Sequence, residues 1–359
     1  MNFWQQLKNK KQPFFCLAPM ADVTDSAFRL LITKYGKPDV MWTEFVSANG
    51  LNSKGREALK RDLEYSEAER PIVAQLFSSD SQNMEAACRL CAELGFDGID
   101  INMGCPDKTI EKQGSGAGMI KTPEVAKEII ASAKRGIEAS GKDIPLSVKT
   151  RVGYNFPDIE NWIGMLLGQD IAALTVHART RKDLSKVPAN WDYIKEVVDL
   201  KNKIAPNTVI IGNGDVISLF DGQQKAKETG VDGIMVGRAL FGNPWFFDAS
   251  REIVATLPKR APWILRKLPF IKKFFDTKRG AAISNVKPIS IKERLETMVE
   301  HCEMFEDMLG DIKNFSIMKK HIKAYVVGFP GAKELRVRLM ENANNSKDVR
   351  EIVSTFLTK

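Results

Sequence analysis

Eight short apolar runs, rich in β-branched residues, recur between residues 13 and 245, and most are separated by an amphipathic segment of helix length. Such alternation demands right-handed crossovers and therefore a parallel sheet. Eight units in this length match closure into a (β/α)8 barrel, the TIM-barrel architecture of the α/β class, better than an open sheet. The runs are Phe14–Ala18, Val40–Phe45, Ile72–Phe77, Gly98–Asn102, Leu146–Thr150, Ala173–His177, Thr208–Gly212 and Gly233–Gly237.

Polar residues and glycines gather just after these runs. Pro19-Met20 follows the first run, Asn102 to Pro106 the fourth, Arg151 the fifth, Asn213-Gly214-Asp215 the seventh and Arg238 the eighth. In a barrel all these positions lie on one face, at the carboxyl ends of the strands, where barrel enzymes carry their chemistry. We therefore expect the functional site on that face.

The chain has 359 residues, of which 43% are hydrophobic and 27% charged. This length suits a large core with one appended domain. No apolar stretch approaches the roughly 20 residues that cross a bilayer. The N-terminus lacks the apolar core of a secretory signal, so we expect a cytoplasmic protein that needs no membrane.

Cysteine usage points to a reducing compartment. The five cysteines form an odd, sparse set, which argues against a disulfide framework. Cys88-x-x-Cys91 resembles a redox or zinc half-site, but it lies inside a helical pattern and has no second pair. We interpret both thiols as small core residues one helical turn apart, and we expect no metal.

Charge distribution divides the chain. The net charge of +8 and pI near 9.1 favour a polyanionic partner. Residues 259–279 interleave basic and aromatic side chains, and helical periodicity returns from Ile291. We predict a catalytic barrel over 1–250, a basic junction over 251–290 and an all-helical domain over 291–359. The segment 263–275 could instead form a membrane-surface helix, although Pro269 interrupts it.

Two glycine-containing segments, 210–215 and 235–240, each end a buried strand and run into a helix start. Glycine permits close backbone approach, helix N-termini present free N–H groups, and Arg238 adds a forked cation, so the pair predicts a phosphate clamp. Because the carboxylate of Asp215 would repel phosphate, we expect it to contribute its backbone N–H and to cap the following helix. Ordinary tight turns are the alternative, but their place at strands seven and eight favours a phosphate-bearing ligand.

The loop after the fourth strand carries Cys105, between a glycine and a proline. An ordinary thiol is protonated at neutral pH, so Cys105 could act as an acid without special tuning. A nucleophilic role would want a nearby base, and His177 is the candidate on this face. Lys149 ends an apolar strand in the barrel mouth, where an unpaired ammonium is costly, so we expect it to be functional.

Six motifs occur in the order and spacing found in tRNA-dihydrouridine synthases, and the chain resembles that family from about residue 13 to 250. A weaker match, Met318 to His321 with Tyr325 and Gly328, is similar to the helical RNA-binding domain of the family. The six motifs are Ala18 to Asp25, Asn102 to Pro106, Lys149 to Arg151, His177 to Arg181, Gly212 to Asp215 and Gly237 to Ala239.

The resemblance implies FMN as a tightly bound cofactor, NADPH as the reductant and tRNA as the substrate whose uridines are reduced. It implies that Cys105 is the general acid. For the isoalloxazine ring it implies Pro19, Met20, Gln75, Lys149 and His177, and for the phosphate Asn213, Gly214, Asp215, Gly237 and Arg238. For the substrate we expect Asn102, Arg151 and Arg179 at the barrel mouth, and Lys319, Lys320 and His321 in the helical domain.

The chain departs from the family pattern at Lys319, where an arginine is common, and at residues 182–188, where many members carry a glycine-containing loop. Two other functions stay open at this point. A flavin barrel could act on a free pyrimidine, as dihydroorotate dehydrogenases do, but a small substrate needs no basic helical domain. A tRNA-binding protein could hold a vestigial redox site, but intact Cys105 and Lys149 argue against it.

Overall fold

All eight predicted strands are present and parallel in the computed structural model, which describes residues 1–10, 12–252 and 287–358. The sheet runs in the order β1-β8-β7-β6-β5-β4-β3-β2, and a bridge from Cys16 to Val40 joins its two ends. The predicted barrel is therefore confirmed. The strands are β1 (Phe14–Leu17), β2 (Met41–Ser47), β3 (Ile72–Phe77), β4 (Gly98–Met103), β5 (Leu146–Arg151), β6 (Ala173–His177), β7 (Val209–Asn213) and β8 (Gly233–Val236).

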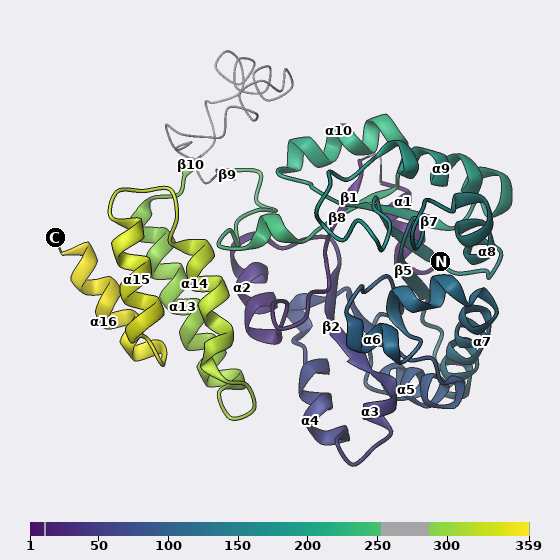
Figure 1. The fold of residues 1–359 in the computed structure, drawn as a ribbon, viewed down its shortest axis with the longest axis horizontal. Coiled ribbons are helices and arrows are strands. Elements are labelled where there is room, and N and C mark those ends of the chain that lie inside the picture. The colour runs from purple at the N-terminus through teal and green to yellow at the C-terminus, as the bar shows by residue number, and fades with distance from the viewer. Residues whose placement is uncertain (11, 253–286, 359) are drawn as a thin grey trace. The chain divides into compact units, whose positions relative to one another are not determined.

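Helices follow the strands and cover the outside of the sheet (Figure 1). Short polar side chains start several of them: Asp25 caps α2 by accepting the N–H of Phe28 at 2.9 Å, and Asp80 caps α5 by accepting that of Asn83 at 2.8 Å. The helices of this part are α1 (Phe3–Lys8), α2 (Ser26–Gly36), α3 (Ala48–Leu51), α4 (Arg56–Lys60), α5 (Ser81–Glu93), α6 (Lys108–Lys112), α7 (Pro123–Ala139), α8 (Gly164–Leu167), α9 (Asp192–Ile204) and α10 (Leu219–Thr229).

The barrel interior is apolar at its amino end and polar toward its carboxyl end. Trp4 of α1 is fully buried against Trp42 and Phe14, with ring centroids 5.6 and 6.0 Å away. Farther along the strands, Gln75, Asp100 and Ser147 form a buried polar layer. Because the apolar end is closed by packed side chains, the other end is where a ligand can enter.

The chain divides into two compact units. The barrel unit comprises residues 1–33 and 37–239, and the helical unit comprises 34–36 and 240–359. Within the helical unit, Gly242 lies against the backbone of Ala324, where a Cβ would come within 2.6 Å. Its elements are β9 (Arg251–Glu252), β10 (Lys287–Pro288), α13 (Ile291–Leu309), α14 (Met318–Tyr325), α15 (Ala332–Asn342) and α16 (Ser346–Leu357).

All five cysteines are free, and Cys88 and Cys91 are fully buried core residues on α5, as predicted. Among the described residues no helix has the length and apolarity to span a bilayer. The basic junction at 259–279 and the segment 263–275 lie outside the described residues.

Candidate active site at the barrel mouth

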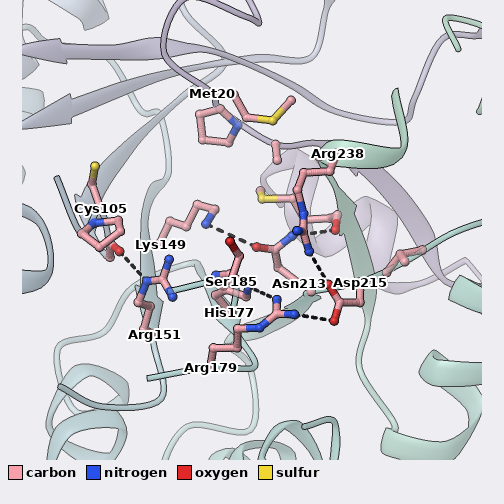
Figure 2. A pocket seen from close by; sticks show the side chains of 18 of the residues that line it. Met20, Cys105, Lys149, Arg151, His177, Arg179, Ser185, Asn213, Asp215 and Arg238 are labelled. Carbon is pink, nitrogen blue, oxygen red and sulfur yellow. Dashed lines mark hydrogen bonds and ion pairs between the residues drawn. The ribbon is translucent and has the colours of Figure 1, made fainter. Parts of the chain in front are cut away.

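A pocket of about 630 Å³ opens at the carboxyl ends of the strands, within the size range of small-molecule and cofactor sites. Residues from the ends of all eight strands line it, and Figure 2 labels ten of them. The structure thus brings together every site residue that was expected in the barrel. These are Pro19, Met20, Gln75, Asn102, Cys105, Lys149, Arg151, His177, Arg179, Asn213, Gly214, Asp215, Gly237 and Arg238.

The loop that carries Cys105 is held from both sides. The side-chain oxygen of Asn102 accepts the backbone N–H groups of Gly104 and Cys105 at 3.1 and 2.9 Å. Arg151 Nε donates to the carbonyl of Gly104 at 2.8 Å, and Ala117 N donates to that of Cys105 at 2.9 Å. Partial burial raises the pKa of the Cys105 thiol. The pocket therefore presents a fixed and protonated thiol at neutral pH.

A buried hydrogen-bond chain lies below this loop. Asp100 accepts Gln75 Nε2 and Ser147 Oγ, each at 2.6 Å. Since the carboxylate takes the amide nitrogen of Gln75, the amide oxygen of Gln75 is oriented to accept Asn102 Nδ2 at 3.1 Å. Burial raises the pKa of Asp100 to about 6. Asp100 was not among the expected site residues, although a charged residue within an apolar strand was a visible signal.

Lys149 extends from β5 into the pocket, and its Nζ lies 3.5 Å from Asn213 Oδ1. Burial and then the neighbouring guanidinium of Arg151 lower the pKa of Lys149 to about 8, while Asp100 acts in the opposite direction. The ammonium is thus mostly charged at pH 7, with little direct hydrogen bonding from the protein. It is a cation available to a ligand in the pocket.

His177 is held neutral and in one tautomer. Arg179 Nη1 lies 3.1 Å from His177 Nε2, and because a guanidinium can only donate, Nε2 must accept and the proton must be on Nδ1. Burial, followed by the nearby Arg151 and Lys149, lowers the pKa of His177 well below its ordinary value. This histidine is a poor base at neutral pH.

Asp215 binds two arginines rather than capping a helix, which corrects the sequence expectation. Its carboxylate pairs with Arg179 and Arg238 and accepts the N–H of Ala189 at 2.9 Å. The cap of α10 is Ser218, whose Oγ accepts the N–H of Asp221 at 3.1 Å. The backbone of Asp215 adopts a left-handed conformation, with φ of 49°.

The end of the pocket at β7 and β8 has the form of an anion cradle. Gly214 has φ of 135°, and a Cβ there would lie 2.8 Å from that of Ala189. Among the described residues, the backbone N–H groups of Gly214 and Asp215 have no acceptor. Successive free N–H groups beside Arg238 form the kind of concavity that binds phosphate. A phosphate-bearing cofactor therefore fits these residues.

The two arginines that we expected to bind substrate, Arg151 and Arg179, donate hydrogen bonds to carbonyls of the loop after β6. Arg151 Nη1 donates to the carbonyls of Thr180 and Leu184, each at 3.1 Å. Arg179 Nε donates to the carbonyl of Val187 at 2.6 Å. Arg151 thus ties the loop after β6 to the end of β5, whereas the bond from Arg179 to Val187 lies within that loop. The same loop brings Leu184 and Ser185 into the pocket, where sequence reasoning had not placed them.

The three residues of α14 that we expected to bind RNA, Lys319, Lys320 and His321, lie in different environments. Lys319 Nζ donates to the carbonyl of Met340 at 2.9 Å, at the end of α15, and Lys320 is partly exposed. His321 is fully buried, stacked on Phe241 and edge-on to His301. The expectation that His321 contacts RNA is therefore wrong, because the apolar face of α14 carries it into the core.

The fold and the pocket are those of a β/α-barrel enzyme whose mouth combines an anion cradle with a protonated thiol. The family model described as "Dihydrouridine synthase (Dus)" matches residues 16–359, and the chain belongs to this family. This match confirms the resemblance seen in the motifs. It also supports the prediction that the protein is an oxidoreductase.

Relatives that match over nearly their whole length are named as probable tRNA-dihydrouridine synthases. Probable tRNA-dihydrouridine synthase 2 of Bacillus subtilis (strain 168) is 36% identical over 361 residues, covering 100% of this chain and 97% of the relative. Probable tRNA-dihydrouridine synthase of Staphylococcus aureus (strain MRSA252) is 35% identical, covering 99% and 95%. A solved structure, histamine dehydrogenase from Rhizobium sp. 4-9, has a TM-score of 0.49 at 13% identity, covering 81% of this chain and 48% of that one.

Proposed function

We propose that this protein is an FMN-dependent tRNA-dihydrouridine synthase that uses NADPH to reduce the C5–C6 double bond of uridines in tRNA. One observation carries the proposal beyond family membership. A protonated thiol, an available ammonium and an anion cradle share one pocket at the mouth of the barrel. A flavin nucleotide needs the ammonium and the anion cradle, and reduction of an enone needs the protonated thiol as an acid.

The residues for FMN divide by chemistry. Gly214, Asp215, Gly237 and Arg238 would hold the phosphate, with Arg238 offering its exposed guanidinium and Asp215 its backbone N–H. Lys149 would stabilise negative charge near N1 and O2 of the ring, helped by Asn213 as its neighbour. At the ring, Pro19 and Met20 would supply backbone groups, Gln75 would meet the pyrimidine edge and His177 would line one side.

Cys105 acts as an acid in this proposal rather than as a nucleophile. A raised thiol pKa keeps its proton on sulfur, and the base that a nucleophile would need has its Nε2 lone pair directed at Arg179. Bound and reduced FMN would supply a hydride to C6 of the uracil. Cys105 then donates its proton to C5, so that the double bond is consumed and charge balances. A positioned acid of this kind contributes on the order of 10²–10⁴ in rate.

We assign substrate contacts to each of the two units separately. Asn102 lines the pocket and has a second amide N–H that Gln75 does not use, so it remains our candidate for the uracil edge. A uridine inside a folded RNA must be flipped out to reach this depth. We assign Lys319 and Lys320 to holding the rest of the tRNA by its phosphates, and we remove His321 from that surface.

The test combines a cofactor assay with a product assay. The purified protein should carry FMN, oxidise NADPH faster when unmodified tRNA is added than with free uridine, and add two hydrogens to a uridine in that tRNA, as mapped by mass spectrometry. Cys105→Ala should retain FMN and tRNA binding while product formation falls by about 10²-fold or more. Protein that never takes up FMN, or equal turnover of free uridine, would refute the proposal.

A further inference from the structure

The turn after β5 displays an aromatic side chain to solvent. Phe156 is 73% exposed, although the turn that carries it is tightly built. A Cβ on Gly153 would lie 1.9 Å from the carbonyl oxygen of Phe156, and Asp158 N donates to the carbonyl of Val152 at 2.8 Å. An ordered turn thus presents a phenyl ring to solvent, where it is accessible to a binding partner.

The neighbouring loop, after β6, fixes this turn in place. Arg181 N donates to the carbonyl of Gly153 at 2.8 Å, and Lys182 N donates to that of Tyr154 at 2.9 Å. The two loops therefore pair by backbone hydrogen bonds. This pairing is made by Arg181 and Lys182, at the start of residues 182–188, where the sequence departs from the usual family loop.

Cations surround the two aromatic rings of the turn. Lys182 Nζ lies 5.7 Å from the centroid of the Phe156 ring. Lys121 Nζ lies 4.8 Å and the Arg181 guanidinium 5.4 Å from the centroid of the Tyr154 ring. Arg181 pairs with Glu111, whereas Lys121 and Lys182 are exposed. We call the set Lys121, Tyr154, Phe156, Arg181 and Lys182 the aromatic rim.

The aromatic rim is continuous with the pocket. Arg151 lines the pocket from the end of β5, two residues before the turn begins at Gly153. Its guanidinium donates to the carbonyl of Gly104 in the Cys105 loop and to the carbonyl of Thr180, just before Arg181. One side chain therefore joins the base of the rim to the loop that positions the thiol.

We propose that the aromatic rim binds the RNA strand next to the flipped uridine, with Phe156 stacking on a neighbouring base and Lys121 and Lys182 facing phosphates. The inference rests on the proposed function, because it places nucleotides around the same pocket. Exposed aromatics flanked by cations are the general solution for unstacked nucleic acid, in which each base offers a flat face and each phosphate a charge. A protein partner or the nicotinamide reductant are the competing occupants.

Four variants of the full-length protein test the stacking. Phe156→Leu keeps an apolar side chain but cannot stack, and Phe156→Trp restores an aromatic face. Ile204→Ala is the matched control, because Ile204 is 45% exposed at the end of α9, which leads into β7 at the opposite end of the barrel. Lys182→Gln tests the phosphate contact. Affinity for unmodified tRNA is measured by fluorescence anisotropy, and flavin reduction by NADPH is measured without tRNA.

We expect Phe156→Leu to weaken tRNA binding by roughly 5- to 100-fold, with Phe156→Trp and Ile204→Ala close to wild type. Lys182→Gln should lower the slope of log affinity against log salt by about one. Flavin reduction without tRNA should be unchanged in all four. Equal tRNA affinity in Phe156→Leu overturns the inference, and so does slower flavin reduction in that variant, which would assign the rim to the reductant.

The binding measurement separates this inference from the proposed function. If wild-type protein binds tRNA but never forms dihydrouridine, the proposed reaction fails while the rim is still judged by affinity. If wild type reduces tRNA and Phe156→Leu binds it equally well, the rim fails while the reaction stands.

Discussion

The side-chain oxygen of Asn102 accepts the backbone N–H of Cys105 at 2.9 Å, so the position of the thiol depends on an amide three residues earlier in the chain. Asn102 is itself oriented through Gln75, whose amide is bonded to the buried carboxylate of Asp100. The acid of the proposed reaction is thus positioned by a chain of hydrogen bonds that begins in the barrel core. Small displacements of a reacting group reduce rate strongly.

Asn102→Ala should therefore slow uridine reduction by roughly 100-fold, since the Cys105 loop loses the acceptor for two N–H groups. FMN affinity should change by only a few-fold. The measurement is single-turnover reoxidation of the reduced enzyme by tRNA. Asn161→Ala is the control, because Asn161 is a surface asparagine whose amide donates to Asp158, three residues earlier. An unchanged single-turnover rate in Asn102→Ala would show that the loop keeps its shape without this amide.

The affinity for FMN should fall as pH rises through about 8, because the Lys149 ammonium, whose pKa is lowered to about 8, loses its charge there. Each pH unit above that value reduces the charged fraction tenfold. Fluorescence titration of FMN-depleted protein between pH 7 and pH 9 measures the effect. Lys149→Met should bind FMN more weakly at pH 7 and show little pH dependence over this range.

Asp100→Asn should move the same transition to lower pH, since Asp100 is the carboxylate that raises the pKa of Lys149 against the effect of burial. The substitution also removes the acceptor that orients Gln75. The midpoint of the FMN titration against pH is the observable. An unshifted midpoint would mean that Asp100 does not influence the ammonium.

Arg179→Lys should weaken FMN binding by roughly 10- to 100-fold, although charge is conserved. One ammonium cannot replace a guanidinium that meets His177, Asp215 and the carbonyl of Val187 together. Arg135→Lys is the matched control, because Arg135 pairs with surface carboxylates on α5 and α7. Comparable losses in the two variants would argue against a specific role for Arg179.

The helical unit should lose stability in mild acid. Burial lowers the pKa of His301 to about 3 and that of His321 well below its ordinary value. The unfolded chain takes up these protons as pH falls below about 6.5 and the folded one does not, so stability is full above that pH and declines toward pH 3. Each histidine costs roughly 1.4 kcal/mol per pH unit in that window. Thermal melts at pH 7 and pH 5 test this, and His301→Leu should reduce the difference.

The sequence predicted some of these features well and others not at all. Strands such as Ile72–Phe77 and Ala173–His177 were located to the residue, because β-branched runs bounded by helix-length segments are local signals. The partners of Asp215 were missed, since Arg179 lies 36 residues away in sequence and meets it only after β6 and β7 pair. His321 was assigned to the surface with its basic neighbours, although Met318, Ile322 and Tyr325 mark its face of the helix as the apolar one.

The amino-acid sequence by itself determined the barrel and the face on which its functional residues gather, because strand order and the alternation of side chains follow from local pattern. Tertiary structure alone decided which atoms meet there and in what protonation state. Burial raises the pKa of the Cys105 thiol, burial and the charge of Arg151 lower the pKa of Lys149, and contact with the Arg179 guanidinium fixes the tautomer of His177. Desolvation and charge proximity are properties of the packed molecule, and no stretch of sequence contains them.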